Sequence, residues 1–410
     1  MRLLLPTIPY LLFLCVVPFS GVSAALSIDQ DALVVVCVPV ADCLAISARE
    51  INATCPAETI YEHLSYSPEE GPYSCARIHQ CLFNEVGALC QQTAEEVQVE
   101  FPHFFWMLEG KRYSRVWVLK STVTPLTLVQ RSLEVPKPLN GSFSTAHLNE
   151  DILSLSVPWH HDETNRTFSA GTRFARNRFE DQEKTCGIFV PDYIKNVYHA
   201  CSLPRECLIE SAPLCVSERK KMFIKLVRSW TCDTEEIIPY VWGGCSYMCR
   251  LPAADFFLDR QTEGTISIAC WRRLFTQVPH GGMDCSGLIL RAAQIVGIHH
   301  YFKNTLTIKE CMTSILPNEE LEEGDLILVP RHVMIVSDLK KNLLIDASSY
   351  TSEFGCAREV PLHKVFRDIA TYEELQQAAL QHIPLCLKTK TGSVHRTVDS
   401  LEFKRLAHYH

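Results

Sequence analysis

Residues 281–290 read GGMDCSGLIL, with a cysteine between an aspartate and a serine. Asp284 is of a type that caps helices, so the pattern predicts a helix over 285–296 that begins at Cys285 and stops at Gly297. A thiol at the positive end of a helix dipole loses its proton more readily, and the backbone N–H there can stabilise an oxyanion. We therefore predict that Cys285 is a nucleophile, with a structural half-cystine as the alternative.

A nucleophilic cysteine needs a base, and two later strands supply a candidate. The stretches HVMIVSD (332–338) and NLLIDASS (342–349) predict a hairpin. In it His332 falls roughly opposite Asp346, and neighbouring strands are about 4.8 Å apart. Cysteine, then histidine, then a polar orienting group is the order in papain-like thiol enzymes. A surface histidine at a strand end is the alternative.

Length, composition and charge bound the class of protein. The chain has 410 residues, a formal net charge of −8 and 47% hydrophobic residues, which is typical of two or three globular domains. Nothing suggests the basic face of a nucleic-acid-binding protein. Residues 1–24 predict a signal peptide, with Arg2 before an apolar segment and small residues at 22–24. No later apolar run could span a bilayer, so we expect an exported protein of the periplasm or cell envelope.

The nineteen cysteines are then expected to pair, because exported thiols tend to form disulfides. Metal binding is the alternative, but the chain has no C-x-x-C pair and no matching histidine spacing. Setting aside Cys15 in the leader and Cys285 leaves seventeen, so one thiol is free or bonded to another chain. The groups that resemble disulfide frameworks are Cys37/Cys43/Cys55, Cys75/Cys81/Cys90 and Cys201/Cys207/Cys215.

The chain divides by pattern into several regions. Residues 25–145 and 146–216 are rich in β-branched and aromatic residues and predict two β domains. Residues 217–370 mix helices with strands, which indicates an α+β domain. The C-terminal region 371–410 opens with a capping box and a helix, after which 383–410 shows no clear pattern.

Four ordered stretches resemble the motif blocks of the NlpC-type cell-wall peptidases, which are papain-like cysteine enzymes of bacteria. Their order along the chain makes the signal more specific than any single block. An insertion over 247–280 departs from the short connection that is usual in the family. The four stretches are PYVWGG (239–244), GMDCSGLILRAAQIVGI (282–298), LEEGDLILVPRHVMIVSD (321–338) and LIDASSY (344–350).

The resemblance implies roles for individual residues. It makes Cys285 the nucleophile and His332 the base, and it gives Asp346 the third place, where the family usually has His, Asn or Gln. Tyr240 matches the family tyrosine beside the nucleophile that is thought to help hold the oxyanion. The last two matches, Asp284 and Ser286, fall at positions that contact the substrate peptide, with an N-cap and an ordinary first-turn serine as alternatives.

The N-terminal half resembles, more weakly, the bacterial SH3-like barrels that often precede this domain. The stretches RIHQCLFNEVGALC (77–90) and FSAGTRFAR (168–176) carry that likeness. The expected architecture is therefore α+β, with a papain-like NlpC catalytic domain preceded by two small SH3-like β-barrel domains. Two β domains with no binding role are the alternative.

The implied reaction is hydrolysis of the amide between D-γ-glutamate and the diamino acid of peptidoglycan stem peptides. It passes through an acyl-enzyme and needs no metal or organic cofactor. The expected partners are peptidoglycan or muropeptide stem peptides, with no nucleic acid and no membrane span. Two alternatives remain open: an amidase or acyltransferase on the same scaffold, and a catalytically decayed, disulfide-rich envelope or wall-binding protein.

Overall fold

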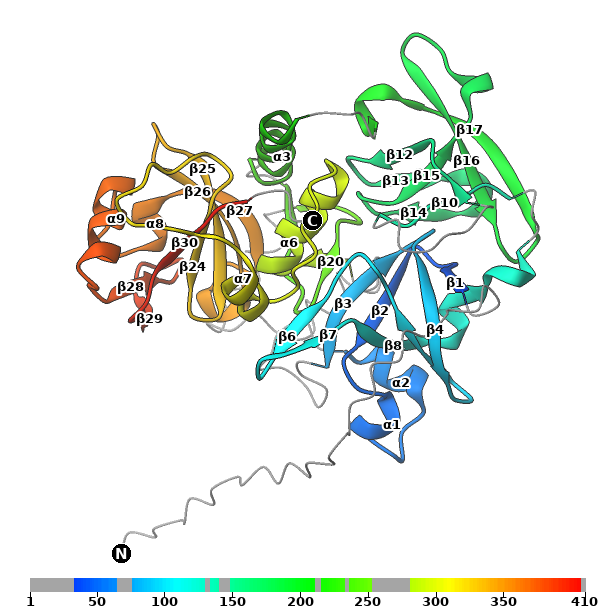
Figure 1. The fold of residues 1–410 in the computed structure, drawn as a ribbon, viewed down its shortest axis with the longest axis horizontal. Helices are drawn as coiled ribbons and strands as arrows, with labels where there is room; N and C mark the ends of the chain where they lie inside the picture. Colours follow the sequence, from blue (N-terminus) through cyan, green and yellow to red (C-terminus); the bar gives the residue numbers. More distant parts are fainter. Residues whose placement is uncertain are drawn as a thin grey trace, which may run out of the picture.

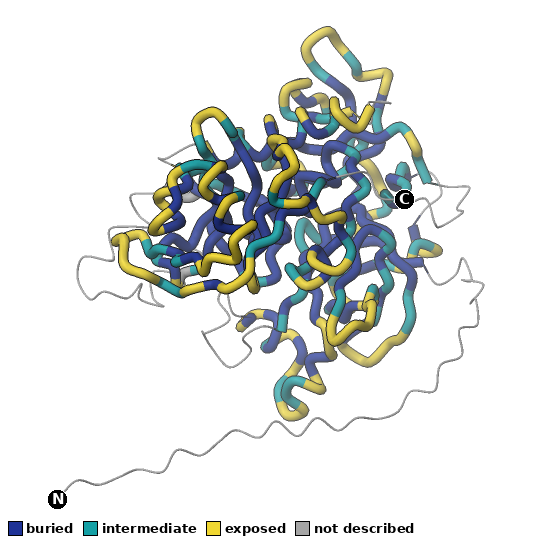
Figure 2. The backbone as a smooth tube through the Cα atoms, turned by 60° about the vertical axis from the view of Figure 1, so that its left-hand side comes forward, coloured by how far each residue is buried: buried dark blue, intermediate teal, exposed yellow. Residues whose placement is uncertain are grey.

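The structure is a computed structural model that describes residues 33–64, 76–129, 133–139, 148–210, 215–232, 236–252 and 281–406. The predicted signal peptide and most of the predicted insertion lie outside these residues. Two β layers lead into a third, mixed layer of strands and helices (Figure 1), which confirms the predicted α+β class. Buried residues run through the interior of all three layers (Figure 2). Within the described ranges, no helix has the length and apolar character needed to cross a membrane.

The first layer is a seven-stranded antiparallel sheet in the order β3-β2-β8-β5-β4-β1-β9. The apolar run of β1 is buried on both faces, since Val34 and Val36 pack into one core and Leu33 and Val35 into another. Short helices α1 (Ala48–Ile51) and α2 (Ala57–Glu62) cover one end. The strands are β1 (Leu33–Val36), β2 (Val40–Leu44), β3 (Arg77–Leu82), β4 (Val86–Gln92), β5 (Glu96–Glu100), β8 (Arg115–Leu119) and β9 (Val123–Pro125), beside the hairpin of β6 (Trp106–Leu108) and β7 (Lys111–Tyr113).

The second layer is a five-stranded antiparallel sheet in the order β17-β16-β15-β12-β18. Leu153 and Leu155 of β12 share one hydrophobic core with Leu33 and Val35 of β1, so the two β layers pack as a unit. The strands are β12 (Ile152–Leu155), β15 (Arg173–Arg176), β16 (Thr185–Asp192), β17 (Val197–Pro204) and β18 (Leu208–Glu210), with small pairs formed by β10 (Val135–Pro136) and β11 (Leu148–Asn149) and by β13 (Trp159–His161) and β14 (Arg166–Phe168).

Neither β layer closes into a barrel within the described residues, so the two SH3-like barrels expected from the sequence are not found there. The reason lies at β3, the edge strand of the first sheet, which the third layer covers. The backbone N–H of Cys245 donates to Gln80 Oε1 at 3.0 Å, and Arg291 Nη2 donates to the Gln80 carbonyl at 3.1 Å. An edge covered by another layer is not available for pairing with the far end of its own sheet.

The third layer is an eight-stranded sheet in the order β21-β19-β27-β26-β25-β24-β30-β23. Side chains alternate across it: Val333 and Ile335 face the core under α3 (Val216–Thr231) and α6 (Cys285–Ile295), whereas Met334 and Val336 face α8 (Leu362–Val365) and α9 (Tyr372–Leu380). Helices thus cover both faces (Figure 1). The strands are β19 (Glu236–Pro239), β21 (Leu251–Pro252), β23 (Ser314–Ile315), β24 (Leu326–Val329), β25 (His332–Asp338), β26 (Leu343–Ser348), β27 (Cys356–Pro361) and β30 (Glu402–Lys404).

The C-terminal region is part of this layer. The predicted capping box is confirmed, because the Thr371 side chain accepts from the Glu374 N–H and the Glu374 side chain accepts from the Thr371 N–H. The patternless stretch forms the hairpin of β28 (Leu385–Lys388) and β29 (Val394–Val398), and then β30, which pairs with β24 and β23. These strands of three to five residues are too short to give a sequence period.

The predicted disulfide groups are not formed within the described residues, where no disulfide joins two cysteines. Cysteines that are neighbours in the sequence lie in different cores: Cys37 packs between the two β layers, Cys43 inside the first sheet and Cys55 against α1 and α2. The Cys43 sulfur lies 3.5 Å from that of Cys81, which is not a bonded distance. Proximity in sequence does not bring these thiols together.

Candidate active site

The predicted nucleophile stands at the start of α6. Asp284 caps this helix, as predicted, because its Oδ1 accepts the backbone N–H of Gly287 at 2.5 Å. All eleven residues of α6 are buried, and Cys285 itself is 9% exposed. The sulfur therefore lies at the positive end of the helix dipole and is largely shielded from water.

The turn after Tyr240 packs against the start of α6 and forms backbone hydrogen bonds with it. Gly243 adopts a left-handed conformation with φ of 70°, and a Cβ there would overlap the backbone of Arg77. The carbonyl of Gly244 accepts from the Asp284 N–H at 3.2 Å. The β-bridge between β20 (Cys245–Ser246) and β22 (Gly282–Met283) joins the two segments. The WGG block thus fixes the backbone on which Cys285 stands.

The predicted base, His332, is hydrogen-bonded to its predicted orienting group, Asp346. His332 is the first residue of β25, and its Nε2 lies 2.6 Å from Asp346 Oδ1. Ile335 pairs with Ile345, and continuing this register sets Asp346 two residues away from the position opposite His332. The two side chains therefore meet along a diagonal of the sheet rather than directly across it, and the register shifts between Val336 and Asp338.

The His332–Asp346 pair holds a proton strongly. Burial alone would lower the pKa of His332, but the Asp346 carboxylate, its hydrogen bond and the side chain of Cys285 raise it to about 10. The pKa of Asp346 is held well below its usual value, because His332, Arg358 and Ser348 outweigh the opposing effect of burial. The ring is therefore protonated near neutral pH, hydrogen-bonded to the carboxylate and close enough to Cys285 for that side chain to affect its pKa.

Asp346 has two further partners that the sequence analysis missed. Its Oδ2 accepts from Ser348 Oγ and from Arg358 Nη2, the latter at 3.1 Å. Arg358 is opposite Asp346 in the register of β26 and β27, and its guanidinium lies 3.1 Å from the centre of the Phe354 ring. The strand register would have identified Arg358 as a partner of Asp346. Reading that register requires knowing that β27 pairs with β26, which the sequence does not show. These contacts fix the carboxylate that orients His332.

A cavity of about 260 Å³ lies beside these residues, and His332, Asp346 and Tyr240 line it. Cys285 is not among its lining residues, but its charge affects the pKa of Arg396 on the cavity wall. A larger cavity of about 820 Å³ runs along α3 and contains none of the predicted site residues. The smaller cavity is therefore the candidate site.

The cavity wall is strongly basic. Besides Arg358, it carries Arg331 from the turn before β25, and Lys388 and Arg396 from the C-terminal hairpin. Arg331 has a φ of 63°, an uncommon conformation for a residue with a side chain. The sequence analysis missed the contribution of the hairpin, since the tail carried no pattern. This wall is suited to a ligand with carboxylates.

The three remaining predicted residues lie close to the start of α6. Tyr240 is 4% exposed, and its backbone forms an isolated parallel β-bridge with Met283. Asp284 Oδ2 forms a buried ion pair with Lys303 Nζ at 2.7 Å, and Ser286 Oγ donates to Asp284 Oδ1 at 2.9 Å. The side-chain oxygens of Asp284 and Ser286 are thus occupied within the protein. This arrangement favours the alternative reading, in which both residues shape the helix start, over a direct side-chain contact with substrate.

Comparisons with known proteins give structural neighbours only. No family profile and no curated protein matches the chain. An NlpC/P60 family protein from Bacillus cereus is similar at 12% identity and a TM-score of 0.49, over 84% of this chain and 97% of that one. NlpC2 from Trichomonas vaginalis is similar at 10% identity and a TM-score of 0.30, over 80% and 91%. At these scores neither likeness indicates an activity.

Proposed function

We propose that the protein is a cysteine peptidase that cleaves the D-γ-glutamyl–diamino acid amide of peptidoglycan stem peptides. One observation carries the proposal. A histidine that holds its proton against burial is bonded to a carboxylate and also interacts with a cysteine at the start of a buried helix. A thiolate–imidazolium pair of this kind is the attacking unit of cysteine peptidases. The scissile bond follows from the resemblance of the four motif blocks.

In the first half-reaction the Cys285 thiolate attacks the amide carbonyl carbon, and the carbonyl oxygen becomes an oxyanion. In this proposal the Cys285 backbone N–H and the Tyr240 hydroxyl stabilise it. The imidazolium of His332 gives its proton to the leaving nitrogen as the C–N bond breaks. A thioester of Cys285 and the free amine of the diamino acid result.

In the second half-reaction water releases the acyl group. Neutral His332 takes a proton from water as the water oxygen attacks the thioester carbonyl. The C–S bond breaks, the Cys285 thiolate returns and His332 is again protonated. Asp346 stays ionised throughout and holds the ring in one orientation.

The basic cavity supports a substrate of this class. A stem peptide carries free carboxylates beside its scissile amide, and guanidinium and ammonium groups bind carboxylates with charge-assisted hydrogen bonds. Arg331, Lys388 and Arg396 supply such groups. Peptidoglycan lies outside the cytoplasm, which agrees with the predicted signal peptide and with a place in the periplasm or envelope.

The test is release of diamino-acid peptides from purified muropeptides, followed by mass spectrometry. We expect Cys285→Ala to abolish release. The matched control is Cys186→Ala, which removes another buried thiol from the second β layer and should leave release unchanged. Trapping of an acyl group on the wild-type chain, absent from Cys285→Ala, would identify the intermediate. Undiminished release by Cys285→Ala would place the nucleophile elsewhere.

A further inference from the structure

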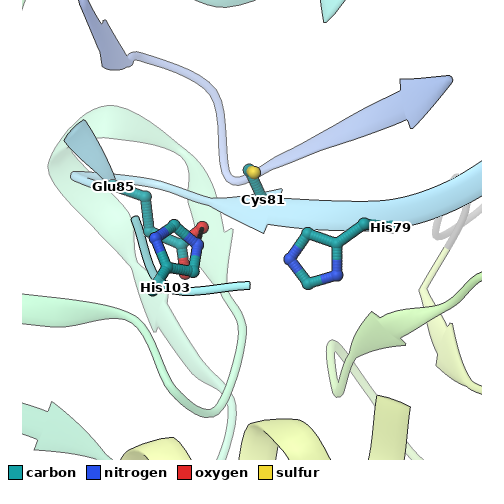
Figure 3. Close-up of side chains that lie close together, drawn as sticks. All are labelled: His79, Cys81, Glu85 and His103. Carbon is teal, nitrogen blue, oxygen red and sulfur yellow. Dashed lines mark ion pairs between the residues drawn. The ribbon is translucent and has the colours of Figure 1, made fainter. Parts of the chain in front are cut away.

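Four potential metal ligands gather inside the first β layer, away from the candidate active site. His79 and Cys81 lie on β3, Glu85 in the turn after it and His103 after β5 (Figure 3). All four are buried, with exposed fractions between 0 and 6%. One ligand atom from each lies within 4.8 Å of those of the others. Residues from two separate segments of the sheet therefore converge on one small volume.

One histidine of this group, His79, has two ring nitrogens without a hydrogen-bond partner. His79 is fully buried. His103 Nε2 lies 2.9 Å from Glu85 Oε2, but without the alignment of a hydrogen bond. Buried polar atoms are nearly always paired, so the unpaired imidazole of His79, beside a thiol, a carboxylate and a second imidazole, calls for a partner. A metal ion would provide one.

We propose that His79, Cys81, Glu85 and His103 form a buried structural site for Zn²⁺. Imidazole nitrogen, thiolate sulfur and carboxylate oxygen are the ligands that this ion prefers, at about 2.0–2.3 Å. Ligands at those distances in a tetrahedron are about 3.3–3.8 Å apart, so atoms within 4.8 Å of one another need to close by about 1.5 Å at most. The spread of ligands over β3, a turn and a second segment is typical of an ion that fixes a fold.

Charge favours a doubly charged cation at this place. The Cys81 thiolate and the Glu85 carboxylate together balance Zn²⁺. Glu85 Oε1 also accepts from Arg291 Nη1 at 2.7 Å, which adds a positive charge at the edge of the cluster. Cys43 lies just outside the four ligands, and its thiol donates to the Cys81 sulfur at 3.5 Å.

The site lies against the helix that carries Cys285. Arg291 of α6 bonds to Glu85, and Gln294 Nε2 of the same helix donates to the His103 carbonyl at 2.8 Å. An ion that joins β3 to the His103 segment would therefore also fix the surface on which α6 rests. We expect removal of the metal to loosen the contact between the first and third layers, and hence to lower the melting temperature of the whole chain.

The experiment measures zinc directly. The full chain, purified without a histidine tag and with a non-thiol reductant, is analysed by elemental mass spectrometry and titrated with Zn²⁺ against a chromophoric chelator. We expect about one zinc ion per chain, bound tightly enough to compete with the chelator. His79→Gln and Cys81→Ser should each lose it. A wild-type chain that neither carries nor takes up zinc would overturn the proposal.

The control is His300→Gln. His300 is also fully buried with two unpaired ring nitrogens, but among the described residues it belongs to no group of potential ligands. This variant should keep its zinc, so loss of zinc from both histidine variants would mean that misfolding, not ligation, releases the ion. Co²⁺ loaded into the wild-type chain gives an independent reading, because a thiolate-to-cobalt charge-transfer band requires Cys81 as a ligand. Absence of that band would remove the sulfur from the site.

None of these readouts uses peptidase activity. A protein that binds zinc but cleaves no muropeptide would contradict the proposed function and leave the metal site in place. A protein that cleaves muropeptides without zinc would do the reverse.

Discussion

His332 Nε2 lies 2.6 Å from Oδ1 of Asp346, a carboxylate that is 1% exposed. An amide or a second imidazole at this place could orient the ring without adding a charge. A buried carboxylate also stabilises the protonated ring, which raises the pKa of His332 to about 10 against the effect of burial. The aspartate at position 346 therefore raises the upper limit of the pH range in which the site holds its proton.

The first prediction concerns this charge. Asp346→Asn keeps the size of the side chain but removes the charge, so the pKa of His332 should fall from about 10 toward its ordinary value. We expect kcat/KM on muropeptides to fall by about 10²–10⁴-fold, and the alkaline limb of the pH–rate profile to move to lower pH. The control is Asp338→Asn, at the far end of β25, the strand that begins with His332. An alkaline limb that stays in place would contradict the pairing.

The second prediction concerns stability against pH. Because the folded state raises the pKa of His332, this group contributes stability that is complete below its unfolded value of 6.5 and is lost as pH rises toward 10. The free energy of unfolding should fall by at most about 1.4 kcal/mol per pH unit over that range. Asp346, with a lowered pKa, contributes above 3.8 and loses its share in acid. Urea unfolding at a series of pH values measures both slopes.

The comparison for this second measurement is His332→Gln. It removes the group that titrates between pH 6.5 and 10, so its stability should be nearly flat over that interval. Equal slopes for the variant and the wild-type chain would assign the titration to another residue.

The third prediction separates backbone strain from a steric clash. Gly243 and Gly110 both have a φ of 70°, but a Cβ on Gly243 would overlap the Arg77 backbone, whereas nothing lies within 4 Å of one on Gly110. We expect Gly110→Ala to lower the free energy of unfolding by about 1–2 kcal/mol, the strain alone. Gly243→Ala should lower it further and also reduce kcat, since this turn supports the start of α6. Denaturant unfolding and muropeptide turnover measure the two effects.

Much of the third layer could be predicted from the sequence because its signals are local. The Asp284 cap, the apolar face of α6 and the strand beginning at His332 depend on residues within one turn or one strand. The meeting of His332 with Asp346 was also within reach, since a short hairpin limits the register. Its diagonal form was not, because a bulge after Val336 shifts the pairing.

Features that depend on distant segments could not be predicted. The shared core of the two β layers replaces the expected separate barrels, and no spacing in the sequence reports that Leu33 packs with Leu153. The tail places Arg396 on the cavity wall through short strands without a detectable period. The spacing of His79, Cys81 and Glu85 matches no metal motif, and the fourth candidate ligand, His103, comes from another part of the chain.

The last prediction concerns the basic wall of the cavity. Arg396 is half-buried, and its charge is close enough to Cys285 and Asp346 for each to affect its pKa. If it binds a carboxylate of the stem peptide, Arg396→Gln should raise KM several-fold with a smaller change in kcat, because binding and not proton transfer is lost. The difference should shrink as salt increases. An amidated stem peptide, which lacks the carboxylate, should be cleaved equally by the variant and the wild-type chain.

The control for this prediction is Arg367→Gln. It removes an exposed arginine that pairs with Asp368 outside the cavity and should leave KM unchanged. If Arg396→Gln instead lowers kcat and leaves KM unchanged, this arginine acts on the charge balance of the His332–Asp346 pair and does not bind the substrate carboxylate.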